Sequence, residues 1–258
     1  MKSSLAEISA RRDRLASLLK KEGYFSVVDL ASRFVVSEAT VRRDLRALEK
    51  ENLITRTYGG ALSEYDALFM PFYQRNEQNR KSKERIARSA LNHVRAGQSL
   101  FLDAGSTVYT IAEQLGEAGI EPLKVVTNSL PVAEALASRG SSEVHLLGGC
   151  LLPHQLVVVG AGASLSLSSW KFDMAFLSAE AMDAEGLWNS QDDISDFQRH
   201  LCGRSEQGVF CLDETKLGRK APSFLMAWDD VDRLITTAKP DDCSGQGLVW
   251  DEENWENA

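Results

Sequence analysis

The sequence predicts a small, basic helical domain followed by a larger, acidic α/β domain, and three observations support this fold class. The chain has 258 residues, which is enough for a small domain joined to a medium-sized one. Residues 1–60 contain 12 Lys+Arg and 8 Asp+Glu, a balance of +4, whereas the whole chain carries −8, so the remainder carries −12. Apolar residues follow helical spacing in the first 60 positions, and short apolar runs alternate with helical stretches after Ser99. This division indicates two domains with different partners.

The composition excludes several classes of protein. With 43% hydrophobic and 26% charged residues, the chain is typical of a globular protein and not of a collagenous or wholly disordered one. No apolar run approaches the roughly 20 residues of a membrane span, so we expect no membrane partner. Met1 to Ala10 contains no apolar stretch of secretory length, which predicts a cytoplasmic location. The four cysteines form no CxxC pair, so we expect no disulfide framework, metal site or cofactor.

The first 60 residues show three successive helical patterns. The first ends at Gly23, Ser26 can cap the second, and Ser37 opens the third. The apolar positions of the three patterns are, in chain order, Ile8, Leu15, Leu18 and Leu19; Val27, Leu30, Ala31 and Phe34; Val41, Leu45 and Leu48. We therefore predict a helix-turn-helix.

Cations of the third helix fall opposite its apolar stripe. Arg42, Arg43 and Arg46 lie on that side at about 100° per residue. An exposed helix with such a face can enter the DNA major groove, where arginine binds guanine or phosphate. The following strand ends in the turn residues Gly59-Gly60 and predicts a wing that brings Arg56 and Tyr58 near the sugar-phosphate chain. A solvated charged face explains any one arginine, but the whole set favours a winged helix-turn-helix over residues 1–62.

A polar segment follows, without periodicity, around Pro71 and Phe72. We interpret residues 63–80 as a linker between domains. From Lys81 a helical pattern resumes and ends at Gly97.

Residues 81–240 are predicted to form a Rossmann-like α/β domain with a largely parallel sheet. Its strands are the apolar runs Leu100–Leu102, Val125–Val126, Val144–Leu147, Met174–Leu177, Val209–Leu212 and Leu234–Ile235. After residue 240 we predict an acidic, mobile tail, 241–258.

Polar residues follow five of these strands, where the carboxyl ends of a parallel sheet form ligand sites. Gly105 permits close approach, and Ser106, Thr107 and free backbone N–H groups can hold an anion. The other junctions are Thr127–Ser129, Gly148-Gly149, Ser178–Glu180 and Asp213 with Lys216. Each alone is typical of a helix cap or turn. Together they favour a small, polyhydroxylated, phosphorylated ligand.

Both predicted domains resemble the DeoR family of bacterial regulators. The DNA-binding signature is similar in Ser26–Leu45 and Leu53–Ala61, where the family's serine, threonine and paired arginines match Ser37, Thr40, Arg42 and Arg43. The sensor motifs are similar in Asp103–Thr107, Thr127–Leu130, Leu147–Gly149 and Asp213–Gly218.

The resemblance implies a C-terminal fold similar to ribose-5-phosphate isomerase and a repressor, dimeric or tetrameric, that a sugar phosphate releases from operator DNA. It implies phosphate on Gly105, Ser106 and Thr107, with sugar hydroxyls on Asp103, Asn128 and Glu180 and an added charge from Lys216. The predicted DNA-binding residues are Ser37, Thr40, Arg42, Arg43, Arg46, Arg56 and Tyr58, and the predicted effector-binding residues are Asp103, Gly105, Ser106, Thr107, Asn128, Gly148, Gly149, Glu180, Trp188 and Lys216.

Some positions depart from the family pattern or stay open. Gln198 stands where many members have a lysine, which removes a cation from the expected pocket. The segment from Ser178 to Trp188 resembles the variant in fucose-operon-type regulators, and Trp188 either stacks on the sugar or belongs to the core. Arg75 and Lys83 match positions where the family has basic residues, but we interpret both as solvated.

Two other functions compete with that of a regulator. A sugar-phosphate isomerase with a DNA-binding appendage would use Asp103, Glu180 and Lys216 as base and cation. A redox sensor would use Cys150, although no neighbouring cation in the sequence lowers its pKa.

Overall fold

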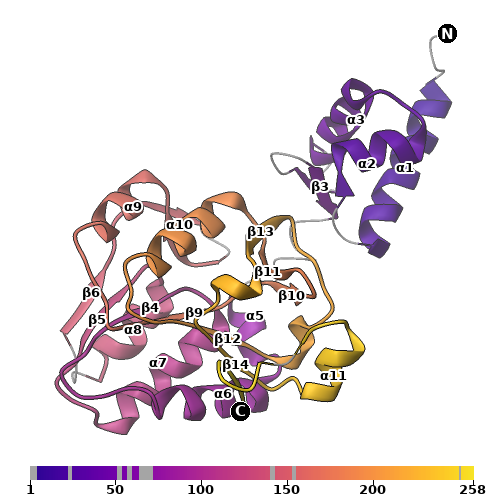
Figure 1. The fold of residues 1–258 in the computed structure, drawn as a ribbon. Coiled ribbons are helices and arrows are strands. Elements are labelled where there is room, and N and C mark those ends of the chain that lie inside the picture. The colour runs from indigo at the N-terminus through magenta and orange to yellow at the C-terminus, as the bar shows by residue number, and fades with distance from the viewer. Residues whose placement is uncertain are drawn as a thin grey trace. The chain divides into compact units, whose positions relative to one another are not determined.

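The computed structural model describes residues 5–22, 25–50, 54–56, 60–63, 72–139, 143–152, 155–249 and 251–258. The chain divides into two compact units, Met1–Met70 and Pro71–Ala258 (Figure 1). Among the described residues, no helix is both long and apolar enough to cross a membrane.

The N-terminal unit is a helix-turn-helix with a small antiparallel sheet. Its helices are α1 (Leu5–Glu22), α2 (Val27–Phe34) and α3 (Glu38–Lys50). The strands β1 (Phe25–Ser26), β2 (Ile54–Arg56) and β3 (Gly60–Ser63) pair in the order β1-β3-β2. The core contains most of the residues predicted from periodicity, with Leu15 and Leu19 of α1, Leu30 of α2, and Val41, Leu45 and Leu48 of α3 all buried, whereas Ile8 is only half-buried and lies outside it. The three predicted helices are confirmed.

The C-terminal unit is built on a seven-stranded parallel sheet in the order β15-β14-β12-β9-β4-β5-β6. The strands are β4 (Ser99–Leu102), β5 (Lys124–Thr127), β6 (Glu143–Leu146), β9 (Met174–Leu177), β12 (Gly208–Leu212), β14 (Arg233–Thr236) and β15 (Trp255–Asn257). The six predicted strands match β4, β5, β6, β9, β12 and β14, which confirms the Rossmann-like class.

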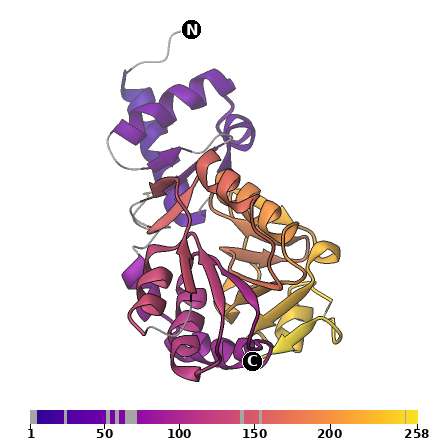
Figure 2. The ribbon, with the colours of Figure 1, turned by 90° about the vertical axis from the view of Figure 1, so that its left-hand side faces the viewer.

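Helices cover both faces of this sheet, as the apolar strands require. Leu100 and Leu102 of β4 face one core cluster and Phe101 faces the other, because successive side chains of a strand point to opposite faces. One cluster lies under α6 (Arg80–Leu91), α7 (Ser106–Ala118) and α8 (Leu130–Ala137). The other lies under α9 (Ala161–Leu167) and α10 (Asp192–Cys202). The two helix groups lie on opposite sides of the strands in the side view (Figure 2).

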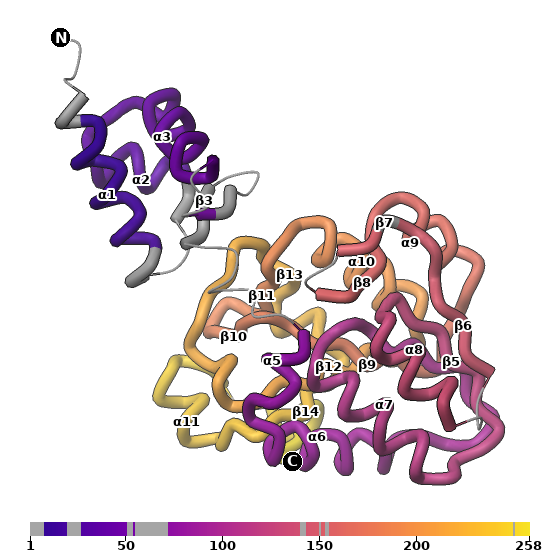
Figure 3. The backbone as a smooth tube through the Cα atoms, turned by 180° about the vertical axis from the view of Figure 1, so that it is seen from behind, coloured from indigo at the N-terminus to yellow at the C-terminus, as the bar shows by residue number. Residues whose placement is uncertain are grey.

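Two smaller sheets and short helices complete the unit. A hairpin joins β7 (Cys150–Leu152) to β8 (Val157–Val159), and β10 (Ala181–Asp183), β11 (Gly186–Asn189) and β13 (Ser223–Met226) form an antiparallel sheet. The 3-10 helices are η1 (Glu214–Lys216) and η2 (Trp228–Asp230), and α11 (Pro240–Gly245) is the last helix. The view from behind shows α5 (Phe72–Glu77) beside α7 (Figure 3).

Two predictions about the chain's organisation are wrong. The interval 63–80 is not wholly a linker, because α5 packs on α7 through the buried ring of Phe72, which meets Tyr109 edge-on at 5.2 Å. The sequence pattern misses α5 because six residues are too few to show a period.

The prediction that residues 241–258 form a mobile tail is also wrong. It contains α11 and β15, and β15 extends the sheet beside β14. Trp255 supplies the burial that holds this short strand, with a ring 4.6 Å from that of Trp228 and only 7% of its surface exposed.

Candidate functional site

The outward face of α3 carries the predicted DNA-binding arginines. Arg42, Arg43 and Arg46 are exposed. Arg42 forms an exposed ion pair with Glu38 at 2.7 Å, which is weak in water. These three cations are therefore available to DNA phosphate or to base edges.

Asp44 lies between these arginines in the sequence but turns inward. It is 1% exposed, and its two carboxylate oxygens accept from Nε of Arg11 at 2.6 Å and Nε of Arg12 at 3.1 Å. Both arginines belong to α1, so this buried network fixes α3 on α1.

Ser37 and Thr40 have a local role at the start of α3. The Thr40 N–H donates to Oγ of Ser37 at 3.2 Å, and the two hydroxyls are hydrogen-bonded at 2.9 Å. Ser37 therefore caps the helix, although both hydroxyls remain near its N-terminus, where phosphate binds favourably. Arg56 lies in β2, but its side chain and the whole of Tyr58 lie outside the described residues.

The second group of predicted residues lies at the carboxyl edge of the parallel sheet. Asp103 follows β4, Asn128 follows β5, and Glu180 comes three residues after the end of β9. Lys216 ends η1, which follows β12. The topology therefore brings these four residues to one edge, as their positions after strands predict.

Asp103 is held by amide groups. It is 2% exposed, Nε2 of Gln198 on α10 donates to its Oδ2, and the Asn128 side chain is also hydrogen-bonded to it. Burial raises the pKa of Asp103 to about 6, and the hydrogen bonds from Gln198 and Asn128 limit the rise. Gln198 is itself fixed, because Nδ2 of Asn189 donates to its Oε1 at 2.6 Å.

Gly105 lies where the chain passes from β4 into α7. Its φ of 133° suits glycine, and an added Cβ would lie 3.2 Å from Cβ of Ser178. Gly105 has no side chain with which to cap α7, so first-turn N–H groups including those of Ser106 and Thr107 are available to an anion.

Charged side chains from four elements meet beside this edge. Glu180 pairs with Lys216 at 3.2 Å, and its other oxygen lies 3.9 Å from Nη1 of Arg75 on α5. Burial lowers the pKa of Arg75, and Glu180 opposes the change. Lys83 of α6 is 3% exposed, and burial lowers its pKa to about 8 against the attraction of Asp213. We call Arg75, Lys83, Glu180, Asp213 and Lys216 the charged cluster.

Within the described part of the chain, the buried side-chain atoms that have no hydrogen-bond partner include Nε of Arg75 and Oδ1 of Asn128 in this region. One is a donor and the other an acceptor, and Asn128 is only 1% exposed. Buried polar groups are costly when unpaired, so both atoms favour a polar ligand at this edge.

Arg75 and Lys83 are the neighbours of the site that the sequence does not assign to it, whereas Gln198 was expected in the pocket. The interpretation of Arg75 and Lys83 as solvated is wrong, since Lys83 is buried and Arg75 faces Glu180. The signal in the sequence was that both residues are basic and match positions where the DeoR family has basic residues. Gln198 stands where the resemblance implies a lysine, and its amide donates to Asp103 and holds that carboxylate in place.

Other predicted effector residues have different surroundings. Gly149 has a φ of 155°, and an added Cβ would lie 2.7 Å from the carbonyl oxygen of Val159, so this glycine allows β8 to approach. Gly148 is exposed. Trp188 donates from Nε1 to Asp183 at 2.8 Å and meets the ring of Phe224 edge-on at 4.9 Å. Its strand neighbour Asn189 is the residue that reaches Gln198.

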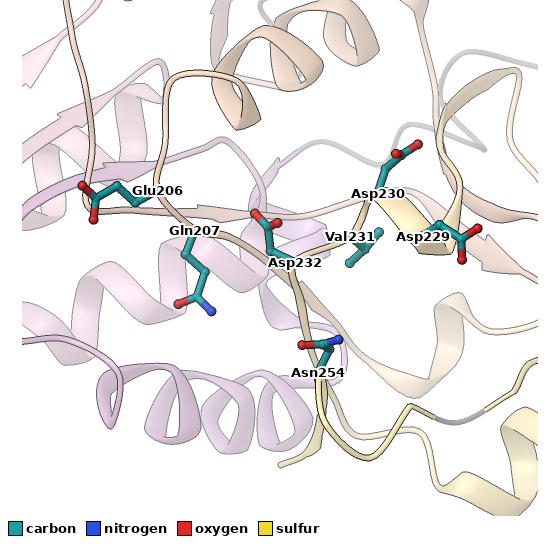
Figure 4. Close-up of a pocket in the computed structure, with 7 residues that line it drawn as sticks. All are labelled: Glu206, Gln207, Asp229, Asp230, Val231, Asp232 and Asn254. Carbon is teal, nitrogen blue, oxygen red and sulfur yellow. The ribbon is translucent and has the colours of Figure 1, made fainter.

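A depression of about 620 Å³ lies at the opposite, amino-terminal end of β12 and β14 (Figure 4). It is lined by Glu206, Gln207, Asp229, Asp230, Val231, Asp232 and Asn254. Its four carboxylates repel anions, and Asp232 has a structural partner, the N–H of Gly208 at 2.8 Å. The candidate effector site is therefore at the other end of the sheet.

Comparison with known proteins assigns both units. Residues 11–66 match the model of the DeoR-like helix-turn-helix domain, and residues 78–238 match that of the DeoR C terminal sensor domain. The chain belongs to the DeoR family.

Members of the DeoR family are similar along nearly the whole chain. The glycerol-3-phosphate regulon repressor of Escherichia coli K12 is 30% identical over 237 residues, which cover 89% of this chain and 91% of that protein. The uncharacterized HTH-type transcriptional regulator YulB of Bacillus subtilis is 31% identical over 243 residues, 93% of each chain. A D-ribose-5-phosphate isomerase solved with phospho-erythronic acid is 17% identical, with a TM-score of 0.41 and 54% of each chain covered.

The family matches also locate the elements that the sequence analysis assigned wrongly. Helix α5 lies between the two matched segments, and α11 and β15 lie beyond residue 238. The segment that joins the two DeoR domains therefore includes an ordered helix that packs on the sensor domain.

Proposed function

We propose that this chain is a DNA-binding repressor of a sugar-catabolism operon whose operator binding is controlled by a phosphorylated sugar. The observation that carries the proposal is the match of both units to the DeoR family, with curated relatives that are repressors of the glycerol-3-phosphate regulon and of the lactose phosphotransferase system. The three exposed arginines of α3 support the DNA-binding half.

We propose that the effector binds at the carboxyl edge of the sheet. Its phosphate would accept from the first-turn N–H groups of α7 at Ser106 and Thr107, beside Gly105. Its hydroxyls would lie against Asp103, Asn128 and Glu180. The unpaired Oδ1 of Asn128 supports this arrangement, because a sugar hydroxyl is the donor that it lacks.

Sensing is preferred over catalysis as the function of this site. An isomerase needs a free carboxylate as base and a cation over the developing enediolate. Here Glu180 is already paired with Lys216, and Asp103 is held by Gln198 and Asn128. The curated relatives are regulators, which agrees with a binding role.

Operator binding by the full-length protein tests the first half of the proposal. An operator selected from random duplexes would be labelled, and fluorescence anisotropy would be measured over a range of salt. The variant Arg42→Ala/Arg43→Ala should bind on the order of 100-fold more weakly, with a salt slope lower by about 2. Lys81→Ala/Arg88→Ala removes two exposed cations of α6 and should bind like wild type. Equal loss in both variants would show that α3 is not the recognition helix.

The second half is tested by thermal unfolding and by the same anisotropy assay, both with a panel of sugar phosphates. The panel contains sn-glycerol 3-phosphate, ribose 5-phosphate, fructose 1-phosphate and glucose 6-phosphate, each beside its unphosphorylated counterpart. At least one phosphate should raise the melting temperature and change operator affinity, since a ligand specific for one state stabilises it by mass action. Equal shifts with the unphosphorylated sugars would remove the anion site from α7.

A further inference from the structure

The positive charge of Arg75 on α5 is only partly balanced by a neighbouring carboxylate. Among the described residues its ion pair is a long one, 3.9 Å to Oε2 of Glu180, while Oε1 of Glu180 has the closer partner Lys216 at 3.2 Å. Nε of Arg75 is buried and, in the described residues, has no hydrogen-bond partner. A guanidinium in this state lacks the bidentate acceptor that its planar fork is suited to bind.

The surrounding charge favours an anion as that acceptor. Within the charged cluster, Arg75, Lys83 and Lys216 carry three positive charges, and Glu180 and Asp213 carry two negative ones. The excess is positive although the whole chain carries −8. A phosphate monoester has the charge and the several acceptor oxygens that this arrangement lacks.

Two contacts hold α5 on the sensor unit. Phe72 packs edge-on against Tyr109, which lies one turn beyond the start of α7. Nζ of Lys83 donates to the carbonyl oxygens of Arg75 and Gln78, at and just after the C-terminal end of α5. Lys83 therefore positions α5. Because Arg75 belongs to this short helix, a shift of Arg75 would move α5 as one body.

Helix α5 is also the first helix of the C-terminal unit in the chain. Eight residues separate its first residue, Phe72, from Ser63, the last residue of β3 in the DNA-binding unit. Helix α5 is therefore the helix of the C-terminal unit that lies nearest in sequence to the DNA-binding unit.

We propose that Arg75 binds the anionic group of the effector, exchanging Glu180 for it, and that α5 thereby communicates occupancy of the sensor site to the DNA-binding unit. This inference rests on the proposed function and identifies both a further effector-binding residue and the element that regulates DNA binding. The two arrangements, with Arg75 on Glu180 or on the anion, give the effector the differential affinity that regulation requires.

Calorimetric titration of the full-length variants tests the binding role. Wild type, Arg75→Gln, Arg75→Lys and the control Arg88→Gln, an exposed arginine of α6, would each be titrated with the four phosphates of the panel and with inorganic phosphate. Arg75→Gln should weaken binding of the active sugar phosphate by at least 10-fold, Arg75→Lys should fall between, and Arg88→Gln should match wild type. Operator affinity without a sugar phosphate should change less than 3-fold in the control Arg88→Gln.

Hydrogen exchange and operator release test the coupling role. In Lys83→Met the amides of α5 should exchange several-fold faster, and the maximal release of operator by a saturating sugar phosphate should fall. Full release in Lys83→Met would overturn the role of α5.

The failures of the two proposals are distinguishable. If a sugar phosphate binds wild type and Arg75→Gln equally well, the role of Arg75 is overturned and the proposed function stands. If none of the phosphates binds wild type, both proposals fall.

Discussion

Asp103 shows how one buried carboxylate shapes the sensor site. It is almost fully buried among amide donors, and burial raises its pKa to about 6, so that it changes charge close to neutral pH. When the pKa of an acid is higher in the folded state than in the unfolded chain, the folded protein is destabilised as pH rises through the window between the two pKa values. For Asp103 that window runs from the ordinary pKa of 3.8 to about 6.

The variant Asp103→Asn should remove this pH dependence. Between pH 7 and pH 4, wild type should gain up to about 3 kcal/mol of unfolding free energy relative to Asp103→Asn, because only the aspartate takes up a proton. Urea unfolding followed by tryptophan fluorescence measures the difference, since all five tryptophans lie in the C-terminal unit. Unfolding free energies that change in parallel with pH would contradict the assignment.

At the residue scale, the sequence predicts site residues that follow strands and misses those that helices supply. Asp103, Asn128 and Lys216 are recognisable because a parallel sheet collects the ends of its strands at one edge. Arg75 and Lys83 come from helices, and their distance from the site in the sequence hides the contact. Successive side chains of a strand point to opposite faces, so Asn189 contacts Gln198 and its neighbour Trp188 points the other way.

Among the elements, β15 is the one whose role the sequence least reveals. It has three residues, and its composition is that of an acidic segment. Its burial comes from Trp255 on Trp228, and Glu256 accepts from Ser89 and pairs with His93 at 2.8 Å. Helix α3 is predictable because its apolar period extends over several residues, and β9 is predictable because all four of its residues are apolar.

Replacing Trp255 should therefore destabilise the C-terminal unit selectively. Trp255→Ala should lower its unfolding free energy by about 3 kcal/mol, as expected for the loss of a buried tryptophan. The matched control Glu253→Ala changes an exposed residue of the same segment and should unfold like wild type. Fluorescence-detected urea unfolding gives both values, and equal midpoints for Trp255→Ala and the control would show that β15 contributes no stability.

For the whole molecule, the separation of charge predicts that DNA binding depends on more than one DNA-binding unit. The +4 of residues 1–60 stands against −12 in the rest of the chain, so the sensor unit as a whole repels DNA. We expect a homo-oligomer whose two DNA-binding units bind two half-sites, because the second binding event is then intramolecular.

A comparison of duplexes with one and two half-sites tests this expectation. The duplex with two should bind the full-length protein at least about 100-fold more tightly. Sedimentation of the free and bound protein gives the number of chains per duplex. Equal affinity for both duplexes, or one chain on the longer duplex, would contradict it.

The inward turn of Asp44 has a consequence for the ions that surround DNA. A carboxylate next to Arg43 on the outer face would keep cations on the duplex, whereas Asp44 is neutralised by Arg11 and Arg12 inside the unit. As the proposed recognition helix, α3 would offer three arginines to phosphate in each DNA-binding unit and would displace on the order of three condensed counterions. Much of the proposed affinity for DNA would therefore come from the entropy of the released counterions. This gain is possible because Asp44, the acid within the run of arginines, is buried.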